Sequence, residues 1–366
     1  MLKHQSQENK QLYYQAQEAF RNKVEESKRN HWKEFLAEKG PEHAYQAYRF
    51  TKERELNTIA PFRQSNGKTT TDANEMAKLL FAGTSINENT REAATLHQML
   101  QYRHRQVVFP EISKHTINIA INNLPNKKPT GPDSIPNEML KVTKQILTPH
   151  LAEAFNKCLK LGRFPPEFRE SLTTILRKAA KDDYSEPKPY RPIALLNTTG
   201  KLFKRIINHR LVHWAETIES IAQGHMGGRQ GRNINDALLL LTTWMRAKWR
   251  EGKVVAGMFL DVKSAYPTVD REKLIAILRK KKVPPYIIEI IISFLSNRHT
   301  QLWLNEFISK LFPIKQGLPQ GSPLSVTLYL IYNSSLLLSK PLSLKEDQLL
   351  IAYIVEVAHL TKSQSP

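Results

Sequence analysis

The stretch that decides the fold reads VVAGMFLDVKSAYPTVDREKL and covers residues 254–274. Val254 to Leu260 is an apolar run of strand-forming residues with the length of a buried strand. It brings Asp261 to the C-terminal end of that strand, where a carboxylate faces solvent or a ligand on one side. A carboxylate in this position suits a divalent metal ion in a phosphoryl-transfer enzyme. An aspartate that ends a strand caps the following turn at least as often, so this stretch alone leaves both interpretations open.

A second informative segment reads IKQGLPQGSPLSVTLYLIY and covers residues 314–332. Its glycines and prolines, with Ser322, predict a tight loop, and the residues from Leu324 onward predict an amphipathic helix. A glycine-bearing loop before a helix presents backbone N–H groups and lets a ligand approach closely. The spacing of its glycines matches neither a Walker loop nor a dinucleotide fingerprint. By pattern alone, the segment is a turn followed by a helix.

The composition narrows the possible partners. The chain has 366 residues and carries 54 Lys and Arg against 34 Asp and Glu, a net charge of +20. Residues 101–210 hold 20 basic and 9 acidic residues, a surplus of 11 that is over half of the total. Such a concentration suits phosphate contact with nucleic acid or an anionic membrane face, and the alternative is a basic solvated surface. The length predicts two or three domains.

Other function classes are excluded by what the sequence lacks. The single cysteine, Cys158, excludes an internal disulfide framework and a zinc site built from cysteines within the chain. No apolar run approaches the length of about 18 residues that a spanning helix needs, and residues 1–30 are polar and charged. We therefore expect neither a membrane span nor a signal peptide.

The first part of the chain is predicted to be helical. Apolar and charged residues are interleaved at mostly helical spacings to about Lys52, which predicts a solvated helical arm. Residues 61–75 have the composition of a loop, and a short helix is expected from Glu75 to Phe81.

Five segments, in order, together resemble the reverse transcriptases of non-LTR (LINE-type) retrotransposons, here as a truncated fragment. Residues 123–141 are similar to the opening segment of that domain, and residues 183–211 to its fingers motif. Residues 223–241 are similar to the segment that precedes the palm. The two palm motifs follow as FLDVKSAY at 259–266 and GLPQGSPLS at 317–325.

The resemblance implies an α+β fold, a right-hand polymerase with fingers and a palm. The palm would contain an antiparallel sheet, a helical arm would precede the domain, and the thumb would be absent. Residues 1–100 would form a helical connector upstream of the polymerase. Residues 101–366 would form the fingers and palm, with a motif core at about 158–366 that ends before a thumb.

The resemblance also implies roles for residues that bind substrate. Tyr266 would be the steric gate that disfavours a 2′-OH, and its alternative is a core aromatic after a strand. Gln320 and Gly321 would lie beside the templating base pair. Lys178 and Arg191 would reach the incoming triphosphate. The alternative interpretation is that both are ordinary surface cations.

The expected metal site departs from the family pattern at one point. Asp261 would be the first palm carboxylate and bind both Mg²⁺ ions. The family's next element is a β-hairpin that carries an aromatic residue, any residue and two aspartates. The matching segment is LLIAYIVEVAHLT at 349–361, where Tyr353 fits the aromatic position, and Val355 and Glu356 occupy the aspartate positions. Asp261 and Glu356 are therefore the candidate catalytic and metal-binding residues. Since Val355 offers no oxygen ligand, the sequence predicts impaired catalysis.

The predicted function is thus RNA-templated DNA synthesis by two-metal nucleotidyl transfer, impaired in this chain. The alternative is an inactive retrotransposon remnant that acts at most as a basic nucleic-acid-binding protein. A basic helical binding protein without polymerase ancestry is disfavoured by the five segments. The expected partners are an RNA template, a DNA primer, dNTPs and an element-encoded nucleic-acid-binding protein, with no membrane. The expected location is the nucleus or the cytoplasm, and not outside the cell.

Overall fold

The computed structural model describes scattered positions between residues 15 and 34, and then residues 59–64, 66–82, 108–178, 181, 183–304, 307–337 and 347–363. The chain forms two compact units, Met1–Thr58 and Ile59–Pro366. The described positions of the first unit are helical and exposed, as a solvated helix should be. The rest of the predicted helical arm, and residues 83–107 of the predicted connector and fingers, lie outside the described residues.

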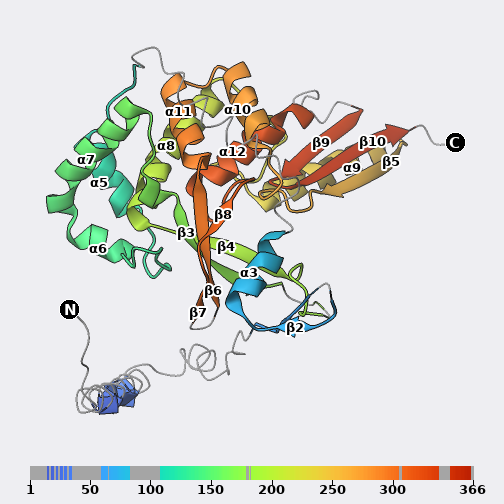
Figure 1. The fold of residues 1–366 in the computed structure, drawn as a ribbon. Coiled ribbons are helices and arrows are strands. Elements are labelled where there is room, and N and C mark those ends of the chain that lie inside the picture. The colour runs from blue at the N-terminus through green and yellow to red at the C-terminus, as the bar shows by residue number, and fades with distance from the viewer. Residues whose placement is uncertain are drawn as a thin grey trace. The chain divides into compact units, whose positions relative to one another are not determined.

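A three-stranded antiparallel sheet lies at one side of the second unit (Figure 1). Its strands are β5 (Val254–Asp261), β10 (Glu356–Ser363) and β9 (Gln348–Tyr353), in the order β5-β10-β9. Helix α9 (Ile234–Arg250) packs on one face of this sheet, where Trp244 and Ala237 meet Leu349, Ile351 and Leu360. The hairpin that the sequence predicts over 349–361 and the antiparallel sheet are both confirmed.

Strand β5 is not the buried strand that its apolar sequence predicts. It forms one edge of the sheet and pairs only with β10 among the described strands. Met258 is 51% exposed and Phe259 is 70% exposed. Because α9 lies beside β9 as well as β5, it leaves the outer part of β5 uncovered. Hydrophobicity correctly predicted a strand here and wrongly predicted its burial.

A second, mixed sheet lies below the helices in Figure 1. Its strands are β3 (Glu170–Arg177), β4 (Tyr190–Leu196), β6 (Arg298–Leu304), β7 (Phe307–Ile308) and β8 (Phe312–Ile314). Strands β3 and β4 form an antiparallel hairpin, whereas β3 and β6 run parallel. The segment between Lys178 and Tyr190 therefore serves as the connection of a hairpin.

A short hairpin and one helix pack against the mixed sheet. They are β1 (Phe62–Arg63), β2 (Thr69–Thr70) and α3 (Ala73–Ala82). Phe62, Met76 and Leu80 share a hydrophobic cluster with residues of β3 and β6. The side chain of Asp72 accepts the N–H groups of Asn74 and Glu75, which explains why α3 begins two residues before the predicted Glu75.

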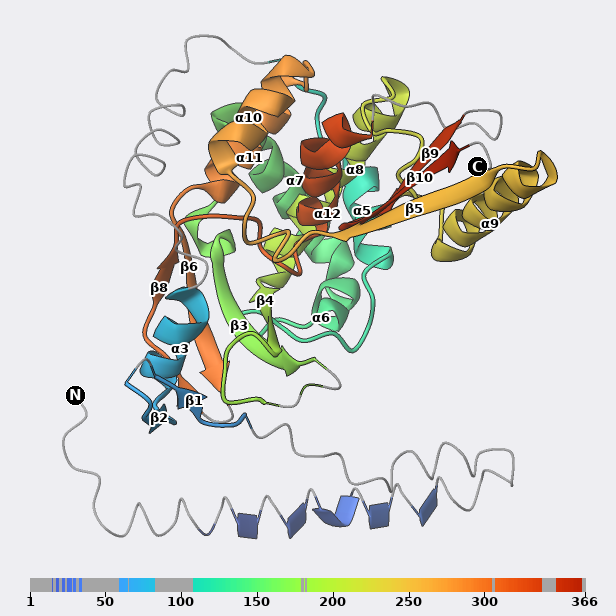
Figure 2. The same ribbon diagram turned by 90° about the vertical axis from the view of Figure 1, so that its right-hand side faces the viewer.

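The largest hydrophobic core lies among the helices. They are α5 (Lys114–Asn122), α6 (Asn137–Val142), α7 (Lys144–Leu161), α8 (Thr198–Thr217), α10 (Arg271–Lys280), α11 (Pro285–Leu295) and α12 (Pro323–Asn333), with short turns η2 (Pro166–Phe168) and η3 (Ser334–Leu336). The ring of Phe203 stacks on both Phe155 and Phe164, at centroid distances of 4.7 and 5.5 Å. Figure 2 shows these helices from the side.

Helix α12 begins where the sequence predicts a helix, but it is not amphipathic. Seven of its eleven residues are buried, including Leu324, Leu328 and Ile331, because α8 and α10 both pack against it. None of the described helices is long and apolar enough to cross a membrane.

Candidate active site

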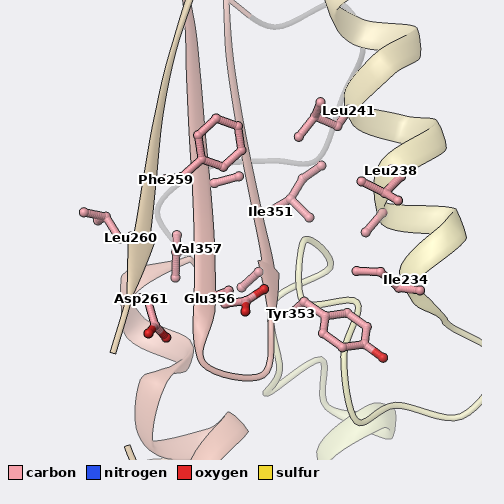
Figure 3. Close-up of a pocket in the computed structure, with 13 residues that line it drawn as sticks. Ile234, Leu238, Leu241, Phe259, Leu260, Asp261, Ile351, Tyr353, Glu356 and Val357 are labelled. Atoms are coloured by element: carbon pink, nitrogen blue, oxygen red, sulfur yellow. The ribbon is translucent and has the colours of Figure 1, made fainter. Parts of the chain in front are cut away.

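Two carboxylates lie opposite each other in the three-stranded sheet. Asp261 ends β5 and Glu356 begins β10, and the two residues are cross-strand partners in the β5–β10 ladder. Directly opposed residues of an antiparallel pair place their side chains on the same face. Figure 3 shows both carboxylates near the tip of the β9–β10 hairpin. The structure thus brings together the two residues that the sequence predicts as catalytic.

The carboxylates border a pocket of about 420 Å³ between the sheet and α9 (Figure 3). Its walls are mainly apolar and include Phe259 from β5, Ile351 from β9 and Leu238 from α9. Sequence reasoning missed these wall residues, because the leucine-rich run of α9 has the ordinary pattern of a packed helix. Only the three-dimensional arrangement shows that part of this run faces the carboxylates.

The turn between β9 and β10 holds the residue that departs from the family pattern. The turn consists of Ile354 and Val355, and Ile354 has a φ of 56°, which is uncommon for a β-branched residue. The backbone N–H of Val262 donates to the carbonyl of Val355 at 3.2 Å. Both turn side chains pack partly buried against the main core. The Val355 side chain therefore contributes to packing and provides no oxygen ligand.

The residues present do not fit a two-metal site. Within the described residues, no group of three or more histidine, cysteine, aspartate or glutamate side chains is placed to hold a metal ion. Asp261 and Glu356 supply hard oxygen ligands of the kind that Mg²⁺ prefers. Two ions held side by side need more carboxylate oxygens than this pair offers. We therefore derive no catalytic step through a metal ion.

Tyr266 lies in the segment that follows β5 and is partly buried. Its ring centroid is 5.4 Å from that of Tyr329 on α12, with the planes at 48°. Burial raises the pKa of Tyr266. Burial also raises the pKa of Tyr329 to about 12, and the nearby charges of Tyr266 and Asp261 add to the effect. Tyr329 thus lies near the carboxylate site, although the sequence shows only an unremarkable aromatic residue within a helix.

The glycine-bearing loop is bound on two sides by backbone hydrogen bonds. The N–H of Leu318 donates to the carbonyl of Tyr266 at 2.8 Å, and the N–H of Ala194 on β4 donates to the carbonyl of Gln320 at 2.9 Å. Gly321 has a φ of +111°, and a Cβ atom there would lie 2.8 Å from the Ala194 carbonyl oxygen. Glycine is required at this position by both backbone conformation and close contact. The loop therefore connects β4 to the segment that carries Tyr266.

Lys178 and Arg191 lie near each other on the β3–β4 hairpin. The Lys178 ammonium donates to the carbonyl of Lys188 at 2.6 Å. The pKa of Lys178 is lowered by partial burial and then by the charges of Arg191 and Lys181. Within the part of the chain that the structure describes, neither Lys178 nor Arg191 contacts Asp261 or Glu356. The structure thus places Tyr266 in the segment after Asp261 and places Lys178 and Arg191 on the hairpin, and the loop that holds Gln320 and Gly321 is hydrogen-bonded to both regions.

A carboxylate pair at the hairpin of an antiparallel sheet, next to a mixed sheet that carries paired cations, has the arrangement of a nucleic-acid polymerase. The family model described as "Reverse transcriptase (RNA-dependent DNA polymerase)" matches residues 177–363. The chain belongs to this family, and its relatives identify it as a reverse transcriptase of the non-LTR (LINE) type. The family has a polymerase fold with palm and fingers and mixed α and β content, which agrees with the two sheets and the helices of this chain.

Two of the relatives from Drosophila melanogaster show the extent of the similarity. The "RNA-directed DNA polymerase from mobile element jockey" is 29% identical over 256 residues, which cover 69% of this chain and 28% of that protein. The "Putative 115 kDa protein in type-1 retrotransposable element R1DM" is 25% identical over 308 residues, covering 83% and 28%. The chain thus spans little more than a quarter of either relative's length. A solved structure of apo telomerase from Candida tropicalis has a TM-score of 0.40 and 12% identity, covering 54% of this chain and 44% of that one.

Proposed function

We propose that this chain is a polymerase domain that binds an RNA template, a DNA primer and dNTPs, and joins nucleotides poorly. The observation that supports this proposal is the pairing of Asp261 with Glu356 across β5 and β10, with Val355 in the turn beside them. The reaction of such a domain is attack of a primer 3′-OH on the α-phosphate of a dNTP, with release of pyrophosphate. Divalent metal ions, Mg²⁺ above all, would supply charge stabilisation in that reaction.

The impairment follows from the carboxylates. Glu356 keeps the negative charge of the aspartate it replaces, but its side chain is longer by one methylene group. A displacement of about 1 Å at a reacting centre can lower a rate by about a hundredfold. Val355 supplies no metal ligand at all, so the loss of rate caused by this residue should be greater. We therefore expect DNA synthesis far slower than that of a domain with both aspartates.

Substrate binding would use groups that this chain retains. Lys178 and Arg191 are close enough on their hairpin to act together on a triphosphate, and an arginine suits the geometry of phosphate oxygens. Tyr266 would pack under the incoming sugar, and Gln320 and Gly321 would lie by the templating base pair. The basic surplus of residues 101–210 would contact the phosphates of the nucleic acid.

The test is primer extension on an RNA template with Mg²⁺ and dNTPs. The wild-type chain is compared with a double variant, Val355→Asp with Glu356→Asp, which restores the expected pair of aspartates. A single variant, Val262→Asp, is the matched control, because it adds a carboxylate next to Asp261 outside the hairpin turn. We expect extension by the double variant at least about a hundredfold above that of the other two.

Three other results would contradict parts of this proposal. Extension by the wild-type chain at the rate of the double variant would show that catalysis is not impaired. No extension by either chain, with salt-sensitive RNA binding retained, would favour the alternative function, a nucleic-acid-binding remnant. The basic surplus of residues 101–210 is the observation that favours this alternative. Absence of RNA binding by folded protein would overturn both the proposed polymerase function and the alternative.

A further inference from the structure

Strand β5 is apolar, and its outer edge is unprotected. Among the described strands β5 pairs only with β10, so its other edge has free N–H and C=O groups along its length (Figure 2). From Val254 to Leu260 it carries no charged residue and no proline. Met258, Phe259 and Leu260 are 51%, 70% and 46% exposed. Soluble proteins usually protect such an edge with charges, proline or a covering segment.

The charges that flank this strand are complementary to each other. Lys253 precedes β5 and Asp261 ends it, and Gly257 lies midway between them. Suppose that two copies of β5 pair in antiparallel fashion with the two Gly257 residues opposite each other. Each Lys253 then lies opposite Asp261 of the second copy, so one register forms two charge pairs.

The same register pairs apolar residues along the rest of the strand. Val255 lies opposite Phe259 of the second copy, and Ala256 lies opposite Met258. Pairs of aromatic and β-branched residues on one face are among the favourable cross-strand contacts. The absence of a side chain at Gly257 leaves the centre of the interface open to close approach of the two backbones.

We propose that two copies of this chain associate through their β5 edges and form a continuous six-stranded antiparallel sheet. The interface is the same on both copies and uses each β5 edge once, so the assembly closes at a dimer. The apolar contacts and the backbone ladder supply the affinity. The two Lys253–Asp261 pairs set the register and add little to the affinity, since exposed ion pairs are weak. A single strand edge is a small interface, so the dimer should be weak.

The dimer would change the surroundings of the carboxylate site, but its formation does not depend on polymerase activity. In the paired register, the Lys253 ammonium of one copy lies opposite Asp261 of the other and competes with a metal ion for that carboxylate. Association is measured in the absence of RNA, nucleotides and divalent ions. A failure of the dimer therefore leaves the proposed function untouched, and an inactive polymerase leaves the dimer untouched.

The first experiment is sedimentation velocity on the full chain over a range of concentrations. We expect a reversible monomer–dimer equilibrium. Lys253→Asp places two aspartates opposite each other and should weaken association at least about tenfold, because like charges directly opposite are repulsive. Asp261→Lys should do the same with two lysines. The double variant with both changes restores opposite charges and should restore the dimer.

A matched control uses Lys114→Asp. Lys114 is exposed at the start of α5, where a carboxylate suits the positive end of the helix, and this change alters net charge by the same amount. It should leave association unchanged. A wild-type chain that remains monomeric at every concentration overturns the proposal. Failure of the double charge swap to recover the dimer overturns the register.

The second experiment tests the register by crosslinking. In a chain with Cys158→Ser, Gly257→Cys should form a disulfide between copies when copper–phenanthroline oxidises the two thiols. A Cβ atom at Gly257 meets the Phe259 ring at 3.4 Å and Leu360 at 3.6 Å, which are ordinary contacts, so the variant should fold. Leu260→Cys, whose two copies lie far apart in this register, should not crosslink. Equal crosslinking by both variants would contradict the paired arrangement.

Discussion

The rings of Tyr266 and Tyr329 lie with their centroids 5.4 Å apart and join the segment after β5 to helix α12. Asp261 lies close enough to Tyr329 to contribute to its raised pKa. Tyr329 thus packs against Tyr266, the proposed sugar-contacting residue, and also lies near Asp261, the proposed metal ligand. A change in either ring should therefore affect the selection of nucleotides as well as local packing.

The first prediction concerns selection against ribonucleotides. Tyr266→Ala removes the ring that would exclude a 2′-OH and should raise the use of rNTPs relative to dNTPs about tenfold or more. Tyr266→Phe keeps the ring and should leave the ratio unchanged. Competitive primer extension, in the chain with aspartates at 355 and 356, measures the ratio. Equal discrimination in the alanine variant would rule out the steric role.

The second prediction concerns Asp261 itself. In the chain with restored aspartates, Asp261→Ala should lower the extension rate by about a hundredfold or more, because it removes a metal ligand. RNA affinity should stay nearly the same, since we propose that residues 101–210 make the main contacts with phosphates. Glu272→Ala on α10 is the control for the loss of one acidic residue. An unchanged extension rate after Asp261→Ala would exclude its role as a metal ligand.

The third prediction concerns RNA binding and salt. The wild-type affinity for single-stranded RNA should fall linearly on a plot of log K against log salt concentration, with a slope of about −0.7 for each phosphate contacted. Replacing both Lys178 and Arg191 by glutamine should weaken binding of dNTPs more than that of RNA. Fluorescence anisotropy measures both affinities. Binding that is insensitive to salt would argue against phosphate contact.

The fourth prediction concerns stability in acid. His225 is wholly buried, and neither of its ring nitrogens has a hydrogen-bond partner among the residues that the structure describes. Its pKa is lowered from 6.5 to about 4 by burial and then by the charges of Arg229 and Arg232. The unfolded chain takes up a proton at a higher pH than the folded chain does. Stability should therefore be lost as pH falls from 6.5 towards 4, by up to about 3 kcal/mol.

Urea unfolding at several pH values measures this loss. His225→Gln cannot take up the proton, so its free energy of unfolding should depend less on pH in this range. The exposed His115, replaced in the same way, is the control. The same pH dependence in wild type and His225→Gln would show that His225 does not cause the loss.

The fifth prediction concerns a cation inside the main core. Lys204 on α8 is wholly buried, and its ammonium lies 5.1 Å from the ring centroid of Phe294. Within the described part of the chain, this ammonium has no hydrogen-bond partner. Burial, and then the charge of the buried Arg298, lower its pKa well below the usual value. Lys204→Met should raise the free energy of unfolding at neutral pH by about 1 kcal/mol or more. Lys201→Met, one turn away and half-buried, should give a smaller change or a loss.

The sequence predicts the local elements of this protein better than its surfaces. The hairpin over 349–361, the loop before α12 and the end of β5 at Asp261 were all predictable, because turn residues and strand-forming runs act locally. The exposure of Phe259 was not, since burial depends on which elements lie above a strand. The position of Tyr329 near Asp261 was equally hidden, because it results from the packing of α12 against distant segments.

The hydrogen bond from the Val262 N–H to the Val355 carbonyl has a consequence for how such chains change over time. It involves only backbone atoms, so the hairpin is fastened to the end of β5 whatever side chain stands at 355. Mutation can then remove the chemistry from this turn while this backbone contact is retained. Quality control in the cell, which recognises misfolding, would not detect such a copy. An impaired polymerase of this kind can persist as a folded protein, and two codon changes, at 355 and 356, separate it from a restored one.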